Sequence, residues 1–298
     1  MIQNYRILNP KFKYQSSKNT SSQEVKALLK KYNLRALKQL GQHFLIDKKV
    51  LIKIVGAAKL TKRDSVLEIG SGLGILTEAL AEKAGKVIAI EIDKGLVKYL
   101  EKGFKNYQNV EIVHENILKL RTEDLASRLG SKNKFNYKVV ANLPYYITSR
   151  VIRYFLEAET KPNLIVFLVQ KEVAERIIAE PPKMSLLSCS VQFYGKPEIV
   201  DFVPQDSFWP KPEIESAILR IKVYKKPKVK VANQKLFFQV IKAGFSNKRK
   251  QLHNALAGGL HLSNEQAKDL LKKSSIDSAR RAQTLSLSEW ARITKHVT

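Results

Sequence analysis

Short apolar runs alternate with helical patterns along the middle of the chain. The apolar runs are rich in Val and Ile and cover residues 65–69, 86–92, 110–114, 138–141 and 164–169. Between them, the spacing of apolar positions predicts helices over 75–84, 95–104, 149–157 and 171–179. Near-continuous apolar strands are typical of a parallel sheet that helices cover on both faces. The alternation therefore predicts an α/β fold with a doubly wound, Rossmann-like sheet.

The alternation stops after residue 180. Residues 185–193 and 217–223 read as two strands, separated by a Pro-rich loop, and strands joined without a crossover helix are expected to pair antiparallel. Beyond a Lys-rich linker, short helices are predicted over 234–243, 248–257, 265–273 and 288–296. We therefore expect three parts: a basic, flexible N-terminal arm over residues 1–27, an α/β domain over 28–224 and a small all-helical domain over 225–298.

The charge of the chain is concentrated at its two ends. Its 298 residues include 53 Lys and Arg against 27 Asp and Glu, a net charge of +26. Residues 1–49 carry +9, residues 50–221 carry +4 and residues 222–298 carry +13. A solvated surface or a contact with anionic lipid are alternative explanations of a basic end. So large an imbalance at both ends favours a polyphosphate partner, most commonly a nucleic acid.

The composition argues against a membrane protein, a disulfide-linked protein and a metalloprotein. No apolar stretch approaches the ~20 residues that span a bilayer. Cys189 is the single cysteine, which excludes an internal disulfide and suits a reducing compartment. Its surroundings read as a strand and predict a buried, inert thiol. Five scattered His residues offer no metal cluster.

The first 25 residues lack the apolar run of a secretory signal. They are basic, rich in Ser, Gln and Asn, and free of acidic residues before Glu24. A mitochondrial transit peptide has such a composition, but Lys rather than Arg dominates and no amphipathic helix is evident, which favours a disordered basic arm. We therefore expect a cytoplasmic protein, with a mitochondrial or plastid location as the alternative.

A glycine-rich turn follows the first predicted strand and leads directly into a helix. Glycines at this place let the backbone turn tightly and approach a ligand over the helix N-terminus. Gly70, Gly72 and Gly74 form G-x-G-x-G, whereas Ile75 stands where the dinucleotide motif G-x-G-x-x-G has its third glycine. The spacing therefore argues against a nicotinamide dinucleotide.

The next two predicted strands also end in polar residues. Glu91 ends the second strand, where an acid accepts hydrogen bonds from ribose hydroxyls, and a solvated strand end is the alternative reading. The third strand ends near Asn116, whose side chain is placed to reach an adenine ring. Three successive strand ends with one contact each are typical of a ligand that contains adenosine. They favour S-adenosylmethionine over another nucleotide.

The fourth predicted strand runs into Asn142, Leu143, Pro144 and Tyr145. An ordinary β-turn is the alternative reading of this segment. An exocyclic adenine amine is a poor nucleophile because its lone pair is delocalised into the ring. Acceptors for both N–H groups draw the nitrogen toward tetrahedral geometry; the Asn142 side-chain oxygen and the carbonyl of Leu143 or Pro144 suit this role. Tyr145 offers a stacking face for a base taken out of its helix.

These residues together resemble the ribosomal RNA adenine dimethyltransferase family. The resemblance covers about residues 28–290 and includes further runs at 40–45, 170–176, 208–212 and 245–252. It is most similar to the small-subunit branch, which implies a class I methyltransferase sheet and S-adenosylmethionine as methyl donor. It further implies dimethylation of two adjacent adenines near the 3′ end of small-subunit rRNA, a role in small-subunit biogenesis, a pre-30S-type particle as partner and a monomer.

The resemblance also implies roles for single residues. His43 and Leu45 would close over the cofactor, Gly70 and Gly72 would lie against it, Glu91 would hold the ribose and Asn116 the adenine. Asn142 would lie between cofactor and target base, and Phe208 would stack on the base opposite Tyr145. The chain departs from the family in two places: Asp is usual at Asn116, and Asn is common at His43.

The basic C-terminal region supplies candidate phosphate contacts, for which a solvated helix face is the alternative. The candidates are Lys248, Arg249, Lys250, Arg280 and Arg281. Two other functions remain open: Erm-like methylation of large-subunit rRNA, and a non-catalytic RNA-binding protein, such as an assembly or organellar transcription factor, on the same fold. Intact Gly70, Glu91 and Asn142 argue against a loss of catalysis.

Overall fold

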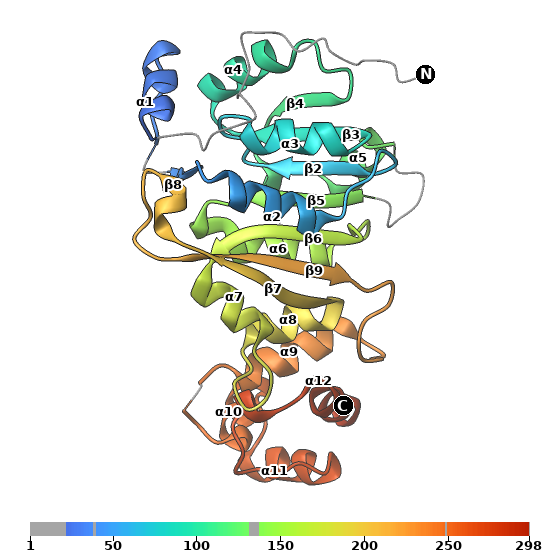
Figure 1. The fold of residues 1–298 in the computed structure, drawn as a ribbon. Coiled ribbons are helices and arrows are strands. Elements are labelled where there is room, and N and C mark those ends of the chain that lie inside the picture. Colours follow the sequence, from blue (N-terminus) through green and yellow to red (C-terminus); the bar gives the residue numbers. More distant parts are fainter. Residues whose placement is uncertain (1–21, 38–39, 131–136, 248, 298) are drawn as a thin grey trace. The chain divides into compact units, whose positions relative to one another are not determined.

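The computed structural model of the chain describes residues 22–37, 40–130, 137–247 and 249–297 (Figure 1). They form two compact units. The first comprises the described residues of Met1–Lys171 together with Val200–Arg220, and the second comprises Glu172–Ile199 together with those of Ile221–Thr298. The second unit thus includes Glu172–Ile199, which lie before the predicted domain boundary at residue 225.

A seven-stranded sheet with the order β4-β3-β2-β5-β6-β9-β7 organises the fold. The strands are β2 (Ser65–Ile69), β3 (Lys86–Glu91), β4 (Val110–His114), β5 (Tyr137–Asn142), β6 (Leu164–Gln170), β7 (Gly195–Val203) and β9 (Ser216–Val223). Pairing is parallel between β4 and β3, β3 and β2, β2 and β5, and β5 and β6. The predicted α/β class is confirmed, with the five predicted parallel strands in place.

The strand order reverses at β2, because the chain adds β3 and β4 on one side and then β5 and β6 on the other. In open α/β sheets, ligands bind beyond the carboxyl ends of the strands where the order reverses. The loops after β2 and β5 meet at this place, so the fold brings the glycine turn next to Asn142.

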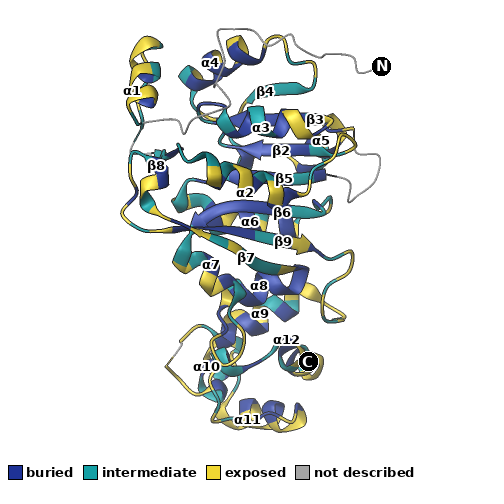
Figure 2. Ribbon diagram, viewed as in Figure 1, coloured by how far each residue is buried: buried dark blue, intermediate teal, exposed yellow. Residues whose placement is uncertain are grey.

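Helices cover this sheet and supply much of its core. They are α2 (Lys48–Ala58), α3 (Ile75–Lys83), α4 (Lys94–Phe104), α5 (Thr122–Arg128) and α6 (Thr148–Glu157). Ile54 of α2 and Leu80 of α3 are fully buried in one cluster with Val66 and Val140 of the central strands. Strands β2, β3, β5 and β6 are accordingly buried along most of their length, β4 at the edge is half-buried, and the helices each keep an exposed face (Figure 2). This burial explains the near-continuous apolar runs in the sequence.

A helix occupies the last part of the range predicted as an N-terminal arm. Helix α1 (Ser22–Lys31) begins inside the range 1–27, and its Val25 and Leu29 are buried against Leu96 and Leu100 of α4. The expectation of a flexible arm is therefore wrong from residue 22 onward, because apolar residues at helical spacing give this segment a face to bury. Residues 1–21 lie outside the described part of the chain.

The predicted strand over 185–193 is also wrong. After α7 (Lys171–Ile178), this segment forms helix α8 (Leu186–Tyr194), and β7 follows it directly. Seven successive residues of α8 are buried, so no exposed face marks the helical period and apolar content alone does not distinguish helix from strand. The overlooked signal is Ser185 with Ser188, a capping box at the helix start.

Four helices complete the second unit: α9 (Gln234–Gly244), α10 (Leu252–Leu260), α11 (Asn264–Lys273) and α12 (Leu287–His296). A Cβ at Gly244 would lie 2.3 Å from the Trp290 ring, which is fully buried, so α9 and α12 pack at close range. Helix α10 begins four residues later than predicted, because the segment before Leu252 forms a turn. Within the described ranges, no helix is long and apolar enough to cross a bilayer.

Candidate active site

A pocket lies in the first unit where the strand order reverses. Its walls come from the glycine turn after β2, the ends of β3 and β4, the loop after β5 and the segment 40–45. The pocket brings together ten of the predicted site residues: His43, Leu45, Gly70, Gly72, Glu91, Asn116, Asn142, Leu143, Pro144 and Tyr145.

The glycine turn approaches the loop after β5 closely. Gly70 has φ +71°, and a Cβ at this position would lie 3.7 Å from the Asn142 carbonyl oxygen. Gly72 has φ +55°, and its Cβ would lie 3.3 Å from the Phe44 ring. Side chains rarely adopt these backbone angles, so the two positions favour glycine. The turn therefore presents bare backbone to the pocket.

Glu91 at the end of β3 fixes this turn. Its Oε2 accepts the Gly72 N–H at 2.9 Å, and its Oε1 accepts the N–H groups of Ile92 at 2.8 Å and Asp93 at 2.9 Å. Burial raises the pKa of the Glu91 carboxyl, while the three N–H donors act in the opposite direction. A carboxylate has about four acceptor sites, so one remains for a ligand hydroxyl.

Glu68, one residue before the end of β2, is a buried acid in the same pocket wall. Its side chain is 1% exposed, and neither carboxyl oxygen has a hydrogen-bond partner among the described residues. Burial raises the pKa of Glu68 to about 8; the neighbouring Thr77 hydroxyl lowers it and the charge of Glu91 raises it further. A buried acid whose pKa is strongly perturbed in the wall of a pocket is a candidate functional group.

Asn116 precedes a short 3₁₀ helix, η2 (Ile117–Lys119). Its Oδ1 caps this helix by accepting the Leu118 N–H at 3.0 Å, which holds the half-buried side chain at the pocket wall. The Nδ2 group remains available as a donor, and Oδ1 keeps a second lone pair. An amide here can thus both donate to and accept from an adenine ring.

Asn142 has a defined side-chain orientation. Its Nδ2 donates to the His43 carbonyl oxygen at 2.9 Å, and because a carbonyl only accepts, the amide nitrogen must face it. Oδ1 then has no partner among the described residues. Pro144 O accepts from both Ile147 N–H and the Thr148 hydroxyl, at 3.2 and 3.5 Å, which leaves the Leu143 carbonyl as the better second acceptor.

Tyr145 is held on two sides. Its hydroxyl and Ser216 Oγ share a hydrogen bond of 2.7 Å, and its ring stacks on His43 with a centroid distance of 5.7 Å and an interplanar angle of 23°. His43 Nδ1 donates in turn to Pro210 O at 2.7 Å. Burial raises the pKa of the Tyr145 hydroxyl, and Ser216 lowers it. One ring face is therefore covered by His43, and a base would use the other.

Phe208 lies elsewhere. Strand β8 (Phe208–Trp209) pairs antiparallel with β1 (Phe44–Leu45), which places Phe208 opposite Leu45 in a buried core cluster. The Phe208 side chain is 3% exposed and does not line the pocket. The ring packs in the core in this structure, and the expected stacking of Phe208 on a base stays a prediction. The Leu45 side chain is buried in the same cluster, although the residue borders the pocket.

The basic candidates of the second unit differ from one another. Arg249, Lys250 and Arg281 are exposed, and Lys248 lies outside the described residues. The backbone N–H of Leu252 donates to the Arg280 carbonyl at 2.7 Å, which brings the segment before α10 next to the loop that holds Arg281. These exposed cations therefore lie in one region.

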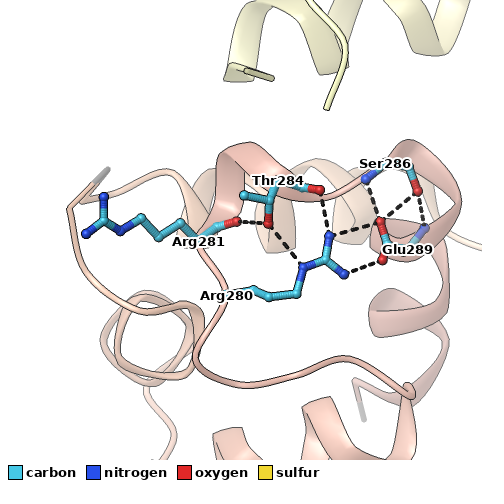
Figure 3. Close-up of polar contacts among 5 residues, drawn as sticks. All are labelled: Arg280, Arg281, Thr284, Ser286 and Glu289. Carbon is cyan, nitrogen blue, oxygen red and sulfur yellow. Dashed lines mark hydrogen bonds and ion pairs between the residues drawn. The ribbon is translucent and has the colours of Figure 1, made fainter. Parts of the chain in front are cut away.

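Arg280 is engaged within its own unit, unlike its neighbour (Figure 3). Its guanidinium forms an ion pair with Glu289 and donates to Thr284 Oγ1 at 3.1 Å and Thr284 O at 2.6 Å. Figure 3 shows the Arg281 side chain directed away from this group. Arg280 thus joins the loop to the start of α12, and its predicted phosphate contact has no support in this arrangement.

Among the pocket residues that sequence reasoning did not single out, Glu68, Tyr146 and Arg150 carry polar groups that bear on function. Glu68 had a signal, since it is a charged residue inside an apolar strand. Tyr146 and Arg150 also line the pocket, but an aromatic residue and a cation near a turn are too common to be singled out.

Cys189 is fully buried, and burial raises the pKa of its thiol to about 12, which confirms a buried, inert thiol. Among the residues described, no group of three or more His, Cys, Asp or Glu is arranged to hold a metal.

Comparisons with known proteins agree on one family. The family pattern described as "Ribosomal RNA adenine dimethylase" matches residues 33–297. A protein from Dehalococcoides mccartyi named "Ribosomal RNA small subunit methyltransferase A" is 47% identical over 267 residues, which cover 90% of each chain. One of the same name from Alkaliphilus metalliredigens is 42% identical over 284 residues, 94% of this chain and 98% of the relative. The crystal structure of a dimethyladenosine transferase from Plasmodium falciparum has a TM-score of 0.70 at 25% identity, covering 84% of this chain and 96% of that one.

Proposed function

Because the chain belongs to the ribosomal RNA adenine dimethylase family, we propose that it dimethylates N6 of two adjacent adenines near the 3′ end of small-subunit rRNA. Two relatives, at 47% and 42% identity over nearly their whole length, carry small-subunit methyltransferase names. These relatives favour the small subunit over Erm-like methylation of the large subunit. The acceptor groups of the pocket favour an active enzyme over a non-catalytic RNA-binding protein.

S-adenosylmethionine is the methyl donor, and the pocket residues fit it. The bare backbone at Gly70 and Gly72 admits a ligand at close range, Glu91 has an acceptor site left for the ribose, and Asn116 suits the adenine ring. The partnerless carboxyl of Glu68 suits a cationic group in the same pocket. When bound, the donor supplies an electrophilic methyl group on a sulfonium.

The chemistry at the target amine relies on acceptors. Asn142 Oδ1 and the Leu143 carbonyl accept from the two N–H groups of the adenine N6, which makes the nitrogen lone pair available for attack. The free face of Tyr145 holds the base that has left its helix. The ammonium that forms is acidic enough to lose its proton to water, so no general base is required and the rate gain comes from positioning.

The observation that carries this proposal is the orientation of Asn142, whose nitrogen is taken by His43 O and whose oxygen is left for the substrate. The test is mass spectrometry of rRNA after incubation of isolated small and large subunits, both unmethylated, with enzyme and isotope-labelled donor. We expect two dimethylated adjacent adenines in the small-subunit rRNA. Label in the large subunit would support the Erm-like alternative, and binding without label would support a non-catalytic protein.

The partner would be small-subunit rRNA within a pre-30S-type particle, bound in part through residues 225–298 as an RNA-binding domain. The exposed cations Arg249, Lys250 and Arg281 support this, because they lie in one region and their side chains form no ion pair or hydrogen bond with the described residues, unlike that of Arg280. We place Lys248 with them on sequence grounds. We further propose that the enzyme acts as a monomer in the cytoplasm and takes part in small-subunit biogenesis, since the relatives named above include bacterial proteins.

A further inference from the structure

Two neighbouring tyrosines of the pocket have different environments. They belong to the 3₁₀ helix η3 (Tyr145–Ile147). Tyr145 is half-buried and bonded to Ser216, whereas Tyr146 is 60% exposed and its hydroxyl has no hydrogen-bond partner among the described residues. Since both residues line the pocket, the second tyrosine stands where the pocket opens to solvent.

The exposed ring lies beside Gly41. A Cβ built at Gly41 would lie 3.5 Å from Tyr146 Cδ1 and 3.7 Å from Cε1, so a side chain at this position would meet the ring at ordinary van der Waals distance. Gly41 has φ +58°, an angle that favours glycine. The ring thus lies beside the segment that contains His43, while most of its surface remains accessible.

A cation follows four residues later. Arg150, in the first turn of α6, also lines the pocket; it is exposed and has no ion pair or hydrogen bond with any described residue. Arg153 of the same helix, by contrast, pairs with Glu157 at 2.8 Å. Arg150 is therefore a cation at the pocket mouth that no carboxylate among the described residues neutralises.

We infer that Tyr146 and Arg150 hold the nucleotide next to the target adenine, with the base on the Tyr146 ring and its phosphate at Arg150. The inference rests on the proposed function and extends it to a second nucleotide. An accessible aromatic face beside a free cation matches the two chemical parts of a nucleotide, a flat base and an anionic phosphate. When one base leaves its stack, its neighbour loses a stacking partner, and the Tyr146 ring replaces it.

Methyl transfer to unmethylated small subunits, measured with the full-length chain, tests this inference. Tyr146→Ala should raise the KM for the particle roughly 5- to 100-fold, the range typical of one base–aromatic stack. Tyr146→Phe keeps the ring and should stay within about 2-fold of the wild type. Donor affinity, measured by calorimetry without RNA, should be the same in all three proteins.

Arg150→Gln should also raise the KM, by a factor that shrinks as salt increases, and Arg150→Lys should recover part of the loss. Arg128→Gln is the matched control: this exposed arginine pairs with Glu111 near the start of β4, at the sheet end away from the pocket, and its loss should leave the KM unchanged.

Three outcomes would overturn the inference: a Tyr146→Ala variant with wild-type KM, a Tyr146→Phe variant as impaired as the alanine variant, or an equal loss in Arg128→Gln. A loss of donor affinity in Tyr146→Ala would also overturn it, since the ring would then serve the cofactor. A failure of the proposed function is distinct, because the wild-type protein itself would then transfer no methyl group to the particle.

Discussion

Replacing Glu68 by Gln should change how the stability of the cofactor-free protein depends on pH. The side chain is 1% exposed, neither oxygen has a partner among the described residues, and burial raises its pKa from 4.5 to about 8. Gln has nearly the same shape but no proton to lose. A comparison of the two proteins therefore isolates the cost of ionising this one carboxyl.

The sign and size follow from proton linkage. Between pH 4.5 and about 8 the folded protein keeps a proton on Glu68 that the unfolded chain has lost, so the wild type loses stability as pH rises. Each pH unit in this window costs about 1.4 kcal/mol. The shift of 8 minus 4.5, or 3.5 units, gives about 5 kcal/mol at pH 8 and about 3 kcal/mol at pH 7. Above pH 8 the difference stays constant.

Urea unfolding at several pH values measures this difference. Each unit contains one of the two tryptophans, Trp209 and Trp290, so a Trp290→Phe background makes the emission of Trp209 report on the first unit. We expect the free energy of unfolding of the wild type to fall relative to that of Glu68→Gln between pH 5 and 8 by several kcal/mol. Parallel curves across this range would refute the reasoning.

Other predictions concern single contacts. Asn142→Ala should lower the methyl-transfer rate at least about 100-fold while small-subunit binding persists, and near-wild-type turnover would rule out the acceptor role. Arg280→Gln should lower the unfolding free energy by about 1–2 kcal/mol because the charged hydrogen bonds to Glu289 and Thr284 are lost, whereas the adjacent Arg281→Gln should leave stability unchanged and lower the salt slope of RNA binding by about 0.7–0.9. Equal melting curves for the two arginine variants would contradict the assignment. Cys189 should react with iodoacetamide only as the protein unfolds, since burial raises its pKa to about 12; rapid labelling of the folded chain would show the thiol to be accessible.

The sequence predicts well those parts of the fold in which burial follows a regular period. The five parallel strands alternate with helices whose apolar positions repeat at helical spacing, and the ends of these strands carry Gly70, Glu91 and Asn142 to the site. Helix α8 was not predicted because it is buried nearly all round, so its sequence lacks the period of apolar and polar positions that distinguishes a helix from a strand.

Contacts between segments that are distant in the sequence cannot be predicted from a local sequence pattern. Phe208 has an aromatic ring beside prolines in the sequence, but its pairing opposite Leu45 decides that the ring is buried. Arg280 and Arg281 are adjacent residues of the same type in the sequence. Only the folded structure shows that Arg280 forms an ion pair with Glu289. The side-chain orientation of Asn142 likewise depends on a carbonyl 99 residues away.

The bonds from His43 to Pro210 and from Tyr145 to Ser216 have a consequence for synthesis of the protein. They join segments 167 and 71 residues apart, and both depend on Val200–Arg220, which returns to the first unit only after Glu172–Ile199 has entered the second. A nascent chain that ends before this return has its glycine turn and Asn142, but Tyr145 lacks its hydrogen bond to Ser216 and the His43 ring on which it stacks lacks its bond to Pro210. The donor side of the pocket can therefore form during translation, whereas the base-holding side is completed only after the ribosome has made the returning segment.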